Sequence, residues 1–236
     1  TAEFLVKLTD KLDIPYVFKA SYRKANRTKS SSFTGIGDEK ALKLLRKVRF
    51  EFDIPVVTDI HESSEAAIAA EYVDVLQIPA FLFRQTNLLR AAGETGKVVN
   101  IKKGQFAAAE AMEFAAKKVL ETGNSQVLLT ERGNMFGYGD MIVDYRNLVW
   151  MQKMGYPVIM DCTHSLQQPN NGSGVTGGLP QLIEPLAKAA VAVGVDGLFI
   201  ETHPNPSKAL SDGANMLPLH KIEELLTKLL RLKDSL

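Results

Sequence analysis

Charged or polar side chains stand at the end of every short apolar run in this sequence. The runs are rich in β-branched and aliphatic residues, as strands buried on both faces are. Packing alone gives no reason for charge at these positions, because each side chain is partly desolvated there. We therefore expect a catalytic site built from strand ends. The groups concerned are Lys19, Asp59, His61, Gln77, Lys102, Lys103, Glu131, Arg132, Asp161, His164, Glu201 and His203.

The cations near these strand ends can bind an anion. An arginine offers phosphate or carboxylate a planar fork of donors, and a lysine offers a movable point charge. Two lysines have a structural alternative, because Lys24 can pair with Asp59 and Lys103 with Glu131. We favour the ion pair for Lys103 alone. The cations expected to bind the anion are Lys19, Lys24, Arg27, Lys102 and Arg132.

A second group combines one imidazole with two carboxylates. His164, Glu201 and Asp212 offer nitrogen and oxygen ligands suited to a divalent cation such as Zn²⁺, Mn²⁺ or Fe²⁺. Their spacing is not a metal-binding motif in itself, so a hydrogen-bonded polar cluster is the alternative. Cys162 is the single cysteine and lies beside an apolar run. We expect it in the core rather than in a nucleophilic role.

These groups need a scaffold of alternating strands and helices. Helical patterns of about a dozen residues separate the apolar runs, as in parallel βα units. Asp38 and either Ser63 or Ser64 are expected to cap two of these helices, and Gly123 to end a third. A last helix is predicted over residues 220–232. The predicted strands are residues 16–21, 55–59, 74–79, 98–102, 126–131, 157–161 and 197–201.

We predict an α/β fold, a (β/α)8 TIM barrel in a single domain over residues 1–236. An open doubly wound sheet is the alternative, but no G-x-G-x-x-G turn or phosphate-binding P-loop follows any run. The predicted strands are one fewer than a barrel needs. Because the chain begins at Thr1 inside an amphipathic helical pattern, we expect the first strand to precede Thr1.

Composition narrows the class of protein. The chain has 236 residues, 45% hydrophobic content and a formal net charge of +1. Bulk charge therefore favours neither nucleic acid nor an anionic membrane as a partner. One cysteine excludes an internal disulfide and fits a reducing compartment, and no apolar run approaches the roughly 18 residues of a membrane helix. We expect a cytoplasmic enzyme that acts on small molecules.

Longer motifs accompany the strand ends in chain order. They are KANR, QIPAFLFRQT, NIKKGQF, ERGNMFGY, DCTHSLQ and ETHPNPSKALSDG. Together they resemble the motifs of 3-deoxy-D-manno-octulosonate 8-phosphate synthases, along nearly the whole chain. The 3-deoxy-arabino-heptulosonate 7-phosphate synthases share part of the pattern and are the nearest alternative. KANR and the absence of a regulatory extension favour the first family.

The resemblance implies a condensation of phosphoenolpyruvate with D-arabinose 5-phosphate and water. The products would be 3-deoxy-D-manno-octulosonate 8-phosphate, used for lipopolysaccharide, and inorganic phosphate. By motif, the residues that bind phosphoenolpyruvate would be Lys19, Gln77, Lys102 and Arg132. Those that bind the sugar phosphate would be Lys24, Asn26, Arg27 and Thr28. Arg84 would reach the site of a neighbouring subunit in a homotetramer.

The resemblance also makes His164, Glu201 and Asp212 the metal ligands or their counterparts. Metal-requiring members of the family carry a cysteine on the first strand, and metal-independent members an asparagine. We expect that strand to precede Thr1. Ser211 stands where metal-independent members tend to have cysteine, which favours a metal-requiring enzyme with Zn, Fe or Mn.

We assign a catalytic role to three residues. Charge develops on the aldehyde oxygen and at the carbon that water attacks, and a fixed cation can stabilise it. Lys24 is the expected proton donor or electrostatic stabiliser, and His61 and Asp59 support the water. Two alternatives are a Schiff-base aldolase that uses Lys102, and a barrel that binds a sugar phosphate without turnover.

Overall fold

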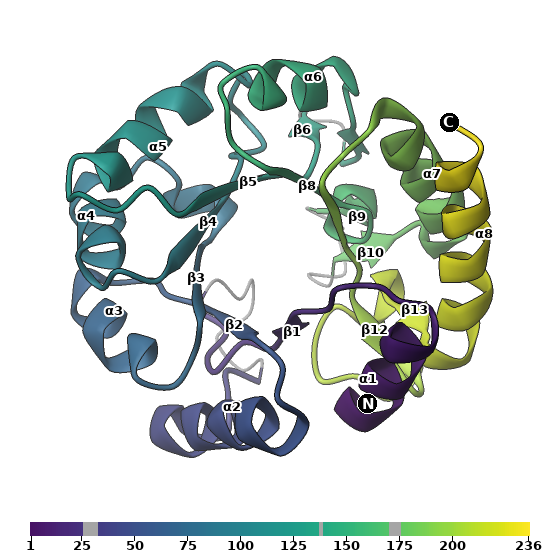
Figure 1. The fold of residues 1–236 in the computed structure, drawn as a ribbon, viewed down its shortest axis with the longest axis horizontal. Helices are drawn as coiled ribbons and strands as arrows, with labels where there is room; N and C mark the ends of the chain where they lie inside the picture. The colour runs from purple at the N-terminus through teal and green to yellow at the C-terminus, as the bar shows by residue number, and fades with distance from the viewer. Residues whose placement is uncertain (26–32, 137–138, 170–175) are drawn as a thin grey trace. The chain divides into compact units, whose positions relative to one another are not determined.

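The computed structural model describes residues 1–25, 33–136, 139–169 and 176–236 (Figure 1). The chain forms two compact units. The first unit contains Ala2–Lys102 and Ala111–Leu128, and the second contains Lys103–Glu110, Leu129–Leu236 and Thr1. Strand β5 (Val127–Glu131) begins in the first unit and ends in the second. No helix in the described ranges is both long enough and apolar enough to cross a membrane.

The first unit alternates parallel strands with helices. Strand β1 pairs with β2, β2 with β3, and β3 with β4, always in parallel. Helices α2 to α5 lie along the outer side of these strands (Figure 1). The elements are α1 (Ala2–Lys11), β1 (Phe18–Lys19), α2 (Asp38–Phe52), β2 (Val56–Asp59), α3 (Ser63–Ala70), β3 (Val75–Ile78), η1 (Ala80–Leu82), α4 (Thr86–Glu94), β4 (Val98–Lys102) and α5 (Ala111–Leu120).

The core of the first unit lies between these strands and helices. Strands β2 and β3 are buried at every position, as expected of parallel strands covered on both faces. Leu88, Leu89 and Ala92 form the buried stripe of α4. Each fully buried leucine contributes roughly 1.5–3 kcal/mol relative to an exposed one. This packing holds the strand ends rigidly, which a catalytic site requires.

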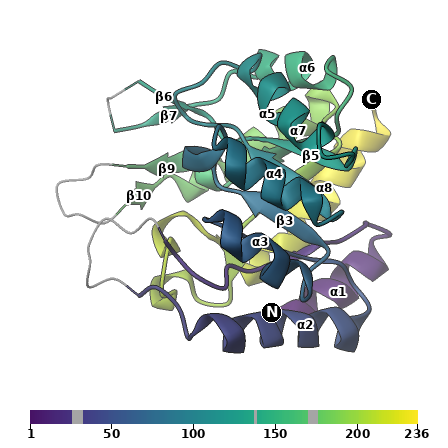
Figure 2. The same ribbon diagram turned by 90° about the vertical axis from the view of Figure 1, so that its left-hand side faces the viewer.

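The second unit continues the parallel pattern. Strand β5 pairs with β8, and β8 with β11. The short antiparallel pairs β6–β7 and β9–β10 extend to the same side of this unit (Figure 2). The elements that follow β5 are β6 (Asn134–Met135), β7 (Met141–Ile142), α6 (Arg146–Gln152), β8 (Val158–Asp161), η2 (His164–Leu166), β9 (Gln167–Gln168), β10 (Gly177–Gly178), η3 (Pro180–Leu182), α7 (Ile183–Val193), β11 (Gly197–Phe199), β12 (Thr202–His203), η4 (Pro206–Lys208), η5 (Gly213–Asn215), β13 (Leu217–Pro218), η6 (Leu219–Lys221) and α8 (Ile222–Asp234).

The order of the predicted strands and their parallel pairing are confirmed, but most of the strands are shorter than predicted. Strand β4 has the predicted bounds, whereas β1 keeps only Phe18–Lys19 and β11 ends at Phe199. An α/β fold with parallel strands is therefore correct. The closed eight-stranded barrel and the single domain over residues 1–236 stay predictions.

Two predicted helix caps are wrong by one residue. Asp38 and Ser63 are the first residues of α2 and α3, and the N-cap positions are held by Gly37 and Glu62 without a side-chain cap hydrogen bond. Gly37 has a φ of 97°, a conformation that glycine adopts without a steric cost. The Asp38 carboxylate is therefore available for an ion pair with another segment.

Candidate active site

A chain of hydrogen bonds crosses the carboxyl ends of the strands in the first unit. The strand register aligns Asp59 with Gln77 and Gln77 with Asn100, so three side chains form one row. Gln77 Nε2 donates to Asp59 Oδ1, and Asn100 Nδ2 donates to Gln77 Oε1 at 3.0 Å. Lys19 Nζ donates to Asp59 Oδ2 at 3.0 Å. Three predicted site residues are thus brought together, and Asn100 is an addition that the sequence reasoning missed.

Asp59 is the charged acceptor of this row. Its Oδ2 also accepts a hydrogen bond of 2.5 Å from Ser21 Oγ. Burial by itself raises the pKa of the Asp59 carboxyl, but Lys19, Ser21 and Lys24 outweigh it, so this pKa lies well below its ordinary value. The side chain therefore stays ionised. It can hold cations or orient a water molecule, but it cannot serve as a proton donor near neutral pH.

Lys102 lies two residues beyond Asn100 on β4, so both side chains point to the same face of the strand. The residue is only 5% exposed. A buried ammonium requires polar or charged partners, because its desolvation is otherwise costly. Such a lysine, fixed at a strand end, is suited to bind an anionic substrate.

His61 lies in the turn between β2 and α3. Its backbone N–H donates to Glu65 Oε2 at 2.7 Å, and its ring Nδ1 lies 3.4 Å from the same oxygen. Burial lowers the pKa of the imidazole, and this outweighs the opposing charge of Asp59. The ring is therefore neutral near pH 7, as a group that accepts a proton from water must be.

Of the residues predicted to bind the sugar phosphate, only Lys24 lies in the described part of the chain. Asn26, Arg27 and Thr28 lie outside the described residues. Lys24 is described, and its backbone N–H donates to the carbonyl of Thr34 at 2.8 Å. Arg84 is exposed between η1 and α4.

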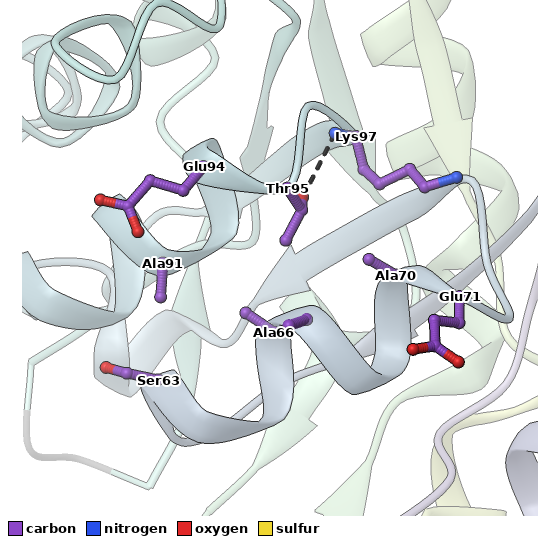
Figure 3. A pocket seen from close by; sticks show the side chains of 9 residues that line it. Ser63, Ala66, Ala70, Glu71, Ala91, Glu94, Thr95 and Lys97 are labelled. Carbon is purple, nitrogen blue, oxygen red and sulfur yellow. Dashed lines mark hydrogen bonds between the residues drawn. The ribbon is translucent and has the colours of Figure 1, made fainter.

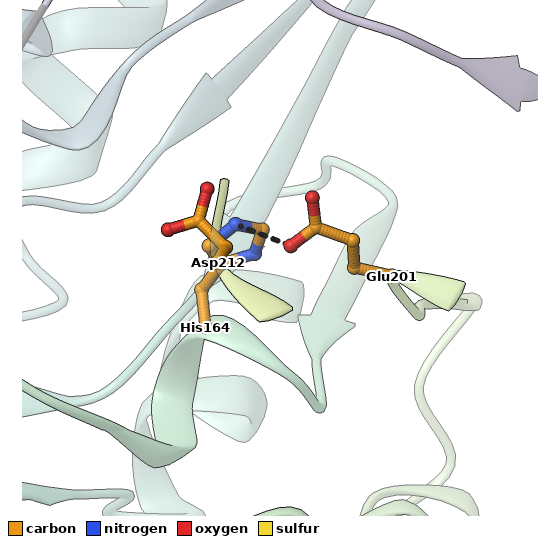
Figure 4. Close-up of side chains that lie close together, drawn as sticks. All are labelled: His164, Glu201 and Asp212. Atoms are coloured by element: carbon orange, nitrogen blue, oxygen red, sulfur yellow. Dashed lines mark ion pairs between the residues drawn. The ribbon is translucent and has the colours of Figure 1, made fainter. Parts of the chain in front are cut away.

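The second unit brings the three predicted metal ligands together (Figure 4). One ligand atom from each of His164, Glu201 and Asp212 lies within 4.8 Å of the others. His164 Nε2 is 3.3 Å from Glu201 Oε2. The carboxylates of Glu201 and Asp212 lie on either side of the imidazole ring. The group is therefore a cluster in space, although its residues are far apart in the chain.

Asp161 completes this cluster from the end of β8. Its Oδ2 lies 2.8 Å from His164 Nδ1, and its Oδ1 accepts the backbone N–H of His164 at 2.8 Å. A carboxylate on one ring nitrogen fixes the imidazole and leaves the other nitrogen for a ligand, as in many metal sites. One imidazole nitrogen and two carboxylates also match the donor preferences of Zn²⁺, Fe²⁺ and Mn²⁺. The residues present therefore fit such an ion.

Arg132 directly follows β5 and is connected to this cluster. Its Nη2 donates to Gln167 Oε1 at 2.6 Å and to the carbonyl of His164 at 3.2 Å. Gln167 Nε2 in turn donates to Asp212 Oδ1 at 3.3 Å. The sequence reasoning missed Gln167, whose only signal was its position one helical turn after His164. Its amide links the guanidinium to a candidate metal ligand.

Lys103 and Glu131 form the predicted ion pair. Lys103 Nζ lies 3.6 Å from Glu131 Oε1, and both side chains are 0% exposed. The same ammonium donates to Asn134 Oδ1 at 2.9 Å and to the carbonyl of Ala107 at 3.2 Å. Burial lowers the pKa of Lys103 and raises that of Glu131, and the mutual attraction of the pair opposes both changes. Lys103 is thus a structural cation.

Cys162 is confirmed as a core residue. It is 0% exposed, and its Sγ lies 3.7 Å from the carbonyl of Met160. Burial raises the pKa of the thiol well above its ordinary value. A thiol in this environment is not a nucleophile, because the thiolate is the reactive form.

A groove lies between α3 and α4 in the first unit (Figure 3). It has a volume of about 420 Å³ and is lined mainly by short side chains, among them Ala66, Ala70 and Ala91. Among the lining residues, the backbone N–H of Lys97 donates to Thr95 Oγ1 at 3.2 Å. No predicted site residue lines this groove.

Comparison with known proteins identifies one family model and several relatives that share one name. The model of the DAHP synthetase I family matches residues 1–236. A protein of Cyanothece sp. named 2-dehydro-3-deoxyphosphooctonate aldolase is 50% identical over 235 residues, covering 100% of this chain and 86% of that protein. A protein of Koribacter versatilis with the same name is 52% identical over 237 residues, covering 99% of this chain and 85% of that protein.

A plant protein is similar to the same extent. The 2-dehydro-3-deoxyphosphooctonate aldolase 1 of Arabidopsis thaliana is 51% identical over 234 residues, covering 97% of this chain and 81% of that protein. This name is a synonym of the synthase whose motifs the sequence resembles, so that resemblance is confirmed. Because the family model spans the chain from its first residue to its last, the chain belongs to the DAHP synthetase I family.

Proposed function

We propose that this protein is a transferase that condenses phosphoenolpyruvate with D-arabinose 5-phosphate and water. The products are 3-deoxy-D-manno-octulosonate 8-phosphate, which is required for lipopolysaccharide biosynthesis, and inorganic phosphate. The observation that carries the proposal is the similarity, over nearly the whole chain, to proteins named for this product. The polar groups at the strand ends support it, because two anionic substrates need fixed cations.

In this reaction the vinyl carbon of phosphoenolpyruvate forms a bond with the aldehyde carbon of the sugar. The carbon is a weak nucleophile, so holding it close to the aldehyde supplies much of the rate enhancement. The residues assigned to phosphoenolpyruvate by the resemblance are Lys19, Gln77, Lys102 and Arg132. Two of these cations, Lys102 and Arg132, are each 5% exposed, which strengthens their attraction for the phosphate and carboxylate.

The proton steps are assigned to residues of the first unit. The aldehyde oxygen gains negative charge as the carbon–carbon bond forms, and Lys24 donates a proton to it or stabilises the charge. Water adds to the carbon that carries the phosphate ester, and the bond between that carbon and the ester oxygen then breaks, which releases inorganic phosphate and leaves a keto group. His61 is neutral and accepts the proton of that water, while ionised Asp59 orients it.

We also propose that His164, Glu201 and Asp212 bind one Zn, Fe or Mn ion. Their ligand atoms lie within 4.8 Å of one another, and Asp161 orients the imidazole. Such an ion supplies Lewis-acid polarisation of a substrate oxygen when it is bound. Gln167, which accepts a hydrogen bond from Arg132, donates to Asp212 and would orient this carboxylate.

The finer structural expectations belong to the same proposal. The parallel strands are taken to be those of a (β/α)8 barrel, the assembly to be a homotetramer in the cytoplasm, and Arg84 to reach the site of a neighbouring subunit. Asn26, Arg27 and Thr28 are assigned to the sugar phosphate by their place in the KANR motif. Size measurement by light scattering tests the tetramer directly.

A matrix of phosphate-release assays tests the proposed function. Phosphate release from phosphoenolpyruvate is expected with arabinose 5-phosphate and not with erythrose 4-phosphate, because the resemblance assigns KANR to the five-carbon sugar. A chelator is expected to remove the activity, and Zn²⁺, Fe²⁺ or Mn²⁺ to restore it. Dependence on erythrose 4-phosphate would instead identify a heptulosonate synthase. Borohydride trapping of an adduct with pyruvate would identify a Schiff-base aldolase.

Replacement of Lys24 by alanine tests the catalytic assignment. Loss of a positioned proton donor costs about 10²–10⁴-fold in rate, so we expect kcat to fall by about 10²-fold or more. The Michaelis constant for phosphoenolpyruvate should change little, because that substrate is assigned to other cations. Lys40→Ala, on an exposed lysine of the same unit, is the control and should keep its activity. Near-normal turnover of the Lys24 variant would remove this residue from the mechanism.

A further inference from the structure

Arg23 joins the two ends of the segment between β1 and α2. It immediately precedes Lys24, and Asp38 is the first residue of α2. Arg23 Nη1 lies 3.6 Å from Asp38 Oδ2. The ion pair therefore holds the chain just before Lys24 against the start of the next helix. The proposed function assigns no role to Arg23 or Asp38.

Glu65 connects Arg23 to His61. Its Oε1 forms an ion pair with Arg23 Nη2, and its Oε2 accepts the backbone N–H of His61 at 2.7 Å. The Glu65 side chain is only 12% exposed. A carboxylate at this depth needs a cation and hydrogen-bond donors to offset its desolvation, and these two contacts supply them.

Tyr22 fixes the chain on the other side of Arg23. It is 3% exposed, and its backbone N–H donates to Thr58 Oγ1 at 3.3 Å. Its ring meets the His61 ring edge-on, with centroids 6.4 Å apart. The guanidinium of Arg23 lies 5.7 Å from the centre of the Tyr22 ring. The backbone that leads into Lys24 and the His61 ring are thus held by the same group of contacts.

We propose that Arg23, Glu65 and Asp38 form an ionic clasp that positions Lys24 and His61 for the reaction. The clasp residues touch no substrate in this scheme and act through the two residues they hold. The inference rests on the proposed function, because that function gives Lys24 and His61 their roles. The inference depends on one observation, which is that the largely covered Glu65 carboxylate binds both Arg23 and the backbone N–H of His61.

A double-mutant cycle tests the clasp. The variants are Arg23→Met, Glu65→Gln and the combination of both. Arg23→Met leaves Glu65 and Asp38 without their shared cation, and Glu65→Gln leaves Arg23 with Asp38 alone. We therefore expect each single change to lower kcat about tenfold, with the Michaelis constant for phosphoenolpyruvate within about twofold of normal. The double variant should lose no more than either single one, because each single change already breaks the Arg23–Glu65 pair and the glutamine oxygen can still accept the His61 N–H.

Glu62→Gln is the matched control. Glu62 is exposed in the same turn, so the change removes the same charge without touching the clasp, and kcat should be unchanged. The proposal is overturned if either single clasp variant keeps normal kcat, or if the two losses multiply in the double variant. It is also overturned if the Michaelis constants for both substrates and kcat change in proportion to a loss of thermal stability, since that indicates a purely structural role.

Amide hydrogen exchange separates this inference from the proposed function. The backbone N–H of Lys24 and of His61 are both hydrogen-bonded in the unmodified protein. Faster exchange at these two amides in Arg23→Met, with unchanged exchange in the strand β3, is expected whether or not the substrates are assigned correctly. Unchanged exchange at both amides would overturn the clasp. Absence of phosphate release in the unmodified enzyme would overturn the proposed function alone.

Discussion

An Arg132→Lys variant is expected to lose about 10³-fold in kcat/KM while it keeps its fold. Removal of one preorganised donor to developing charge costs about 10²–10³-fold. Arg132 is 5% exposed and already donates to Gln167 and to the carbonyl of His164. Its planar fork can hold these acceptors and still present donors to an anion. A lysine at this position has a single ammonium group and cannot do both.

The measurement is steady-state phosphate release at several concentrations of each substrate. The Michaelis constant for phosphoenolpyruvate should rise and kcat should fall, whereas the constant for the sugar phosphate should change least. Arg146→Lys is the control, because Arg146 is exposed on the same unit and pairs with Asp144. It should retain kcat/KM within about twofold. If Arg132→Lys stays within tenfold of the unmodified enzyme, the guanidinium fork does not contribute to catalysis.

Replacement of Lys103 by methionine is expected to lower the free energy of unfolding by about 3–5 kcal/mol. The change leaves the Glu131 carboxylate at 0% exposure without its cation. It also leaves the acceptor oxygens of Asn134 and Ala107 without the donor they share. Denaturant unfolding at neutral pH measures the effect. Lys153→Met, on an exposed lysine of the same unit, should change stability by less than about 0.5 kcal/mol.

A second substitution and a change of pH distinguish charge from packing in this pair. Lys103→Met combined with Glu131→Leu should recover most of the stability, because two apolar side chains can replace a buried ion pair. Burial already raises the pKa of Glu131 in the unmodified protein, and loss of Lys103 removes the charge that opposes this rise. A raised carboxyl pKa in the folded state favours folding at low pH. The Lys103→Met defect should therefore be smaller at pH 5 than at pH 8, and an equal defect at both would show that packing is responsible.

Several features of the site could be predicted from the sequence because they depend on local pattern. Strand positions follow from apolar runs, and the strand ends place Lys19, Asp59 and Gln77 on neighbouring parallel strands. The Lys103–Glu131 pair follows from two opposite charges at adjacent strand ends. The types of residue in the candidate metal group, one histidine and two acids, were also visible. Each of these needs only the chain order and the two-residue period of a strand.

Other contacts depend on where separate segments meet, and no local pattern encodes that. The bond from Gln167 to Asp212 and the ion pair from Arg23 to Glu65 each connect residues roughly forty positions apart. Asp212, whose backbone is left-handed with φ of 54°, comes within 4.8 Å of His164, from which it is far apart in the chain.

The sequence by itself therefore determined the order of strands, the kinds of charge at their ends and the family to which the chain belongs. The tertiary structure decided which of these charges share a hydrogen bond. It bonded Lys19 to Asp59, placed Gln167 between the guanidinium of Arg132 and the carboxylate of Asp212, and gave Glu65 two partners. The physical reason is that a hydrogen bond forms only when its donor and acceptor atoms lie about 3 Å apart. Only the packed positions of the side chains determine distances on that scale.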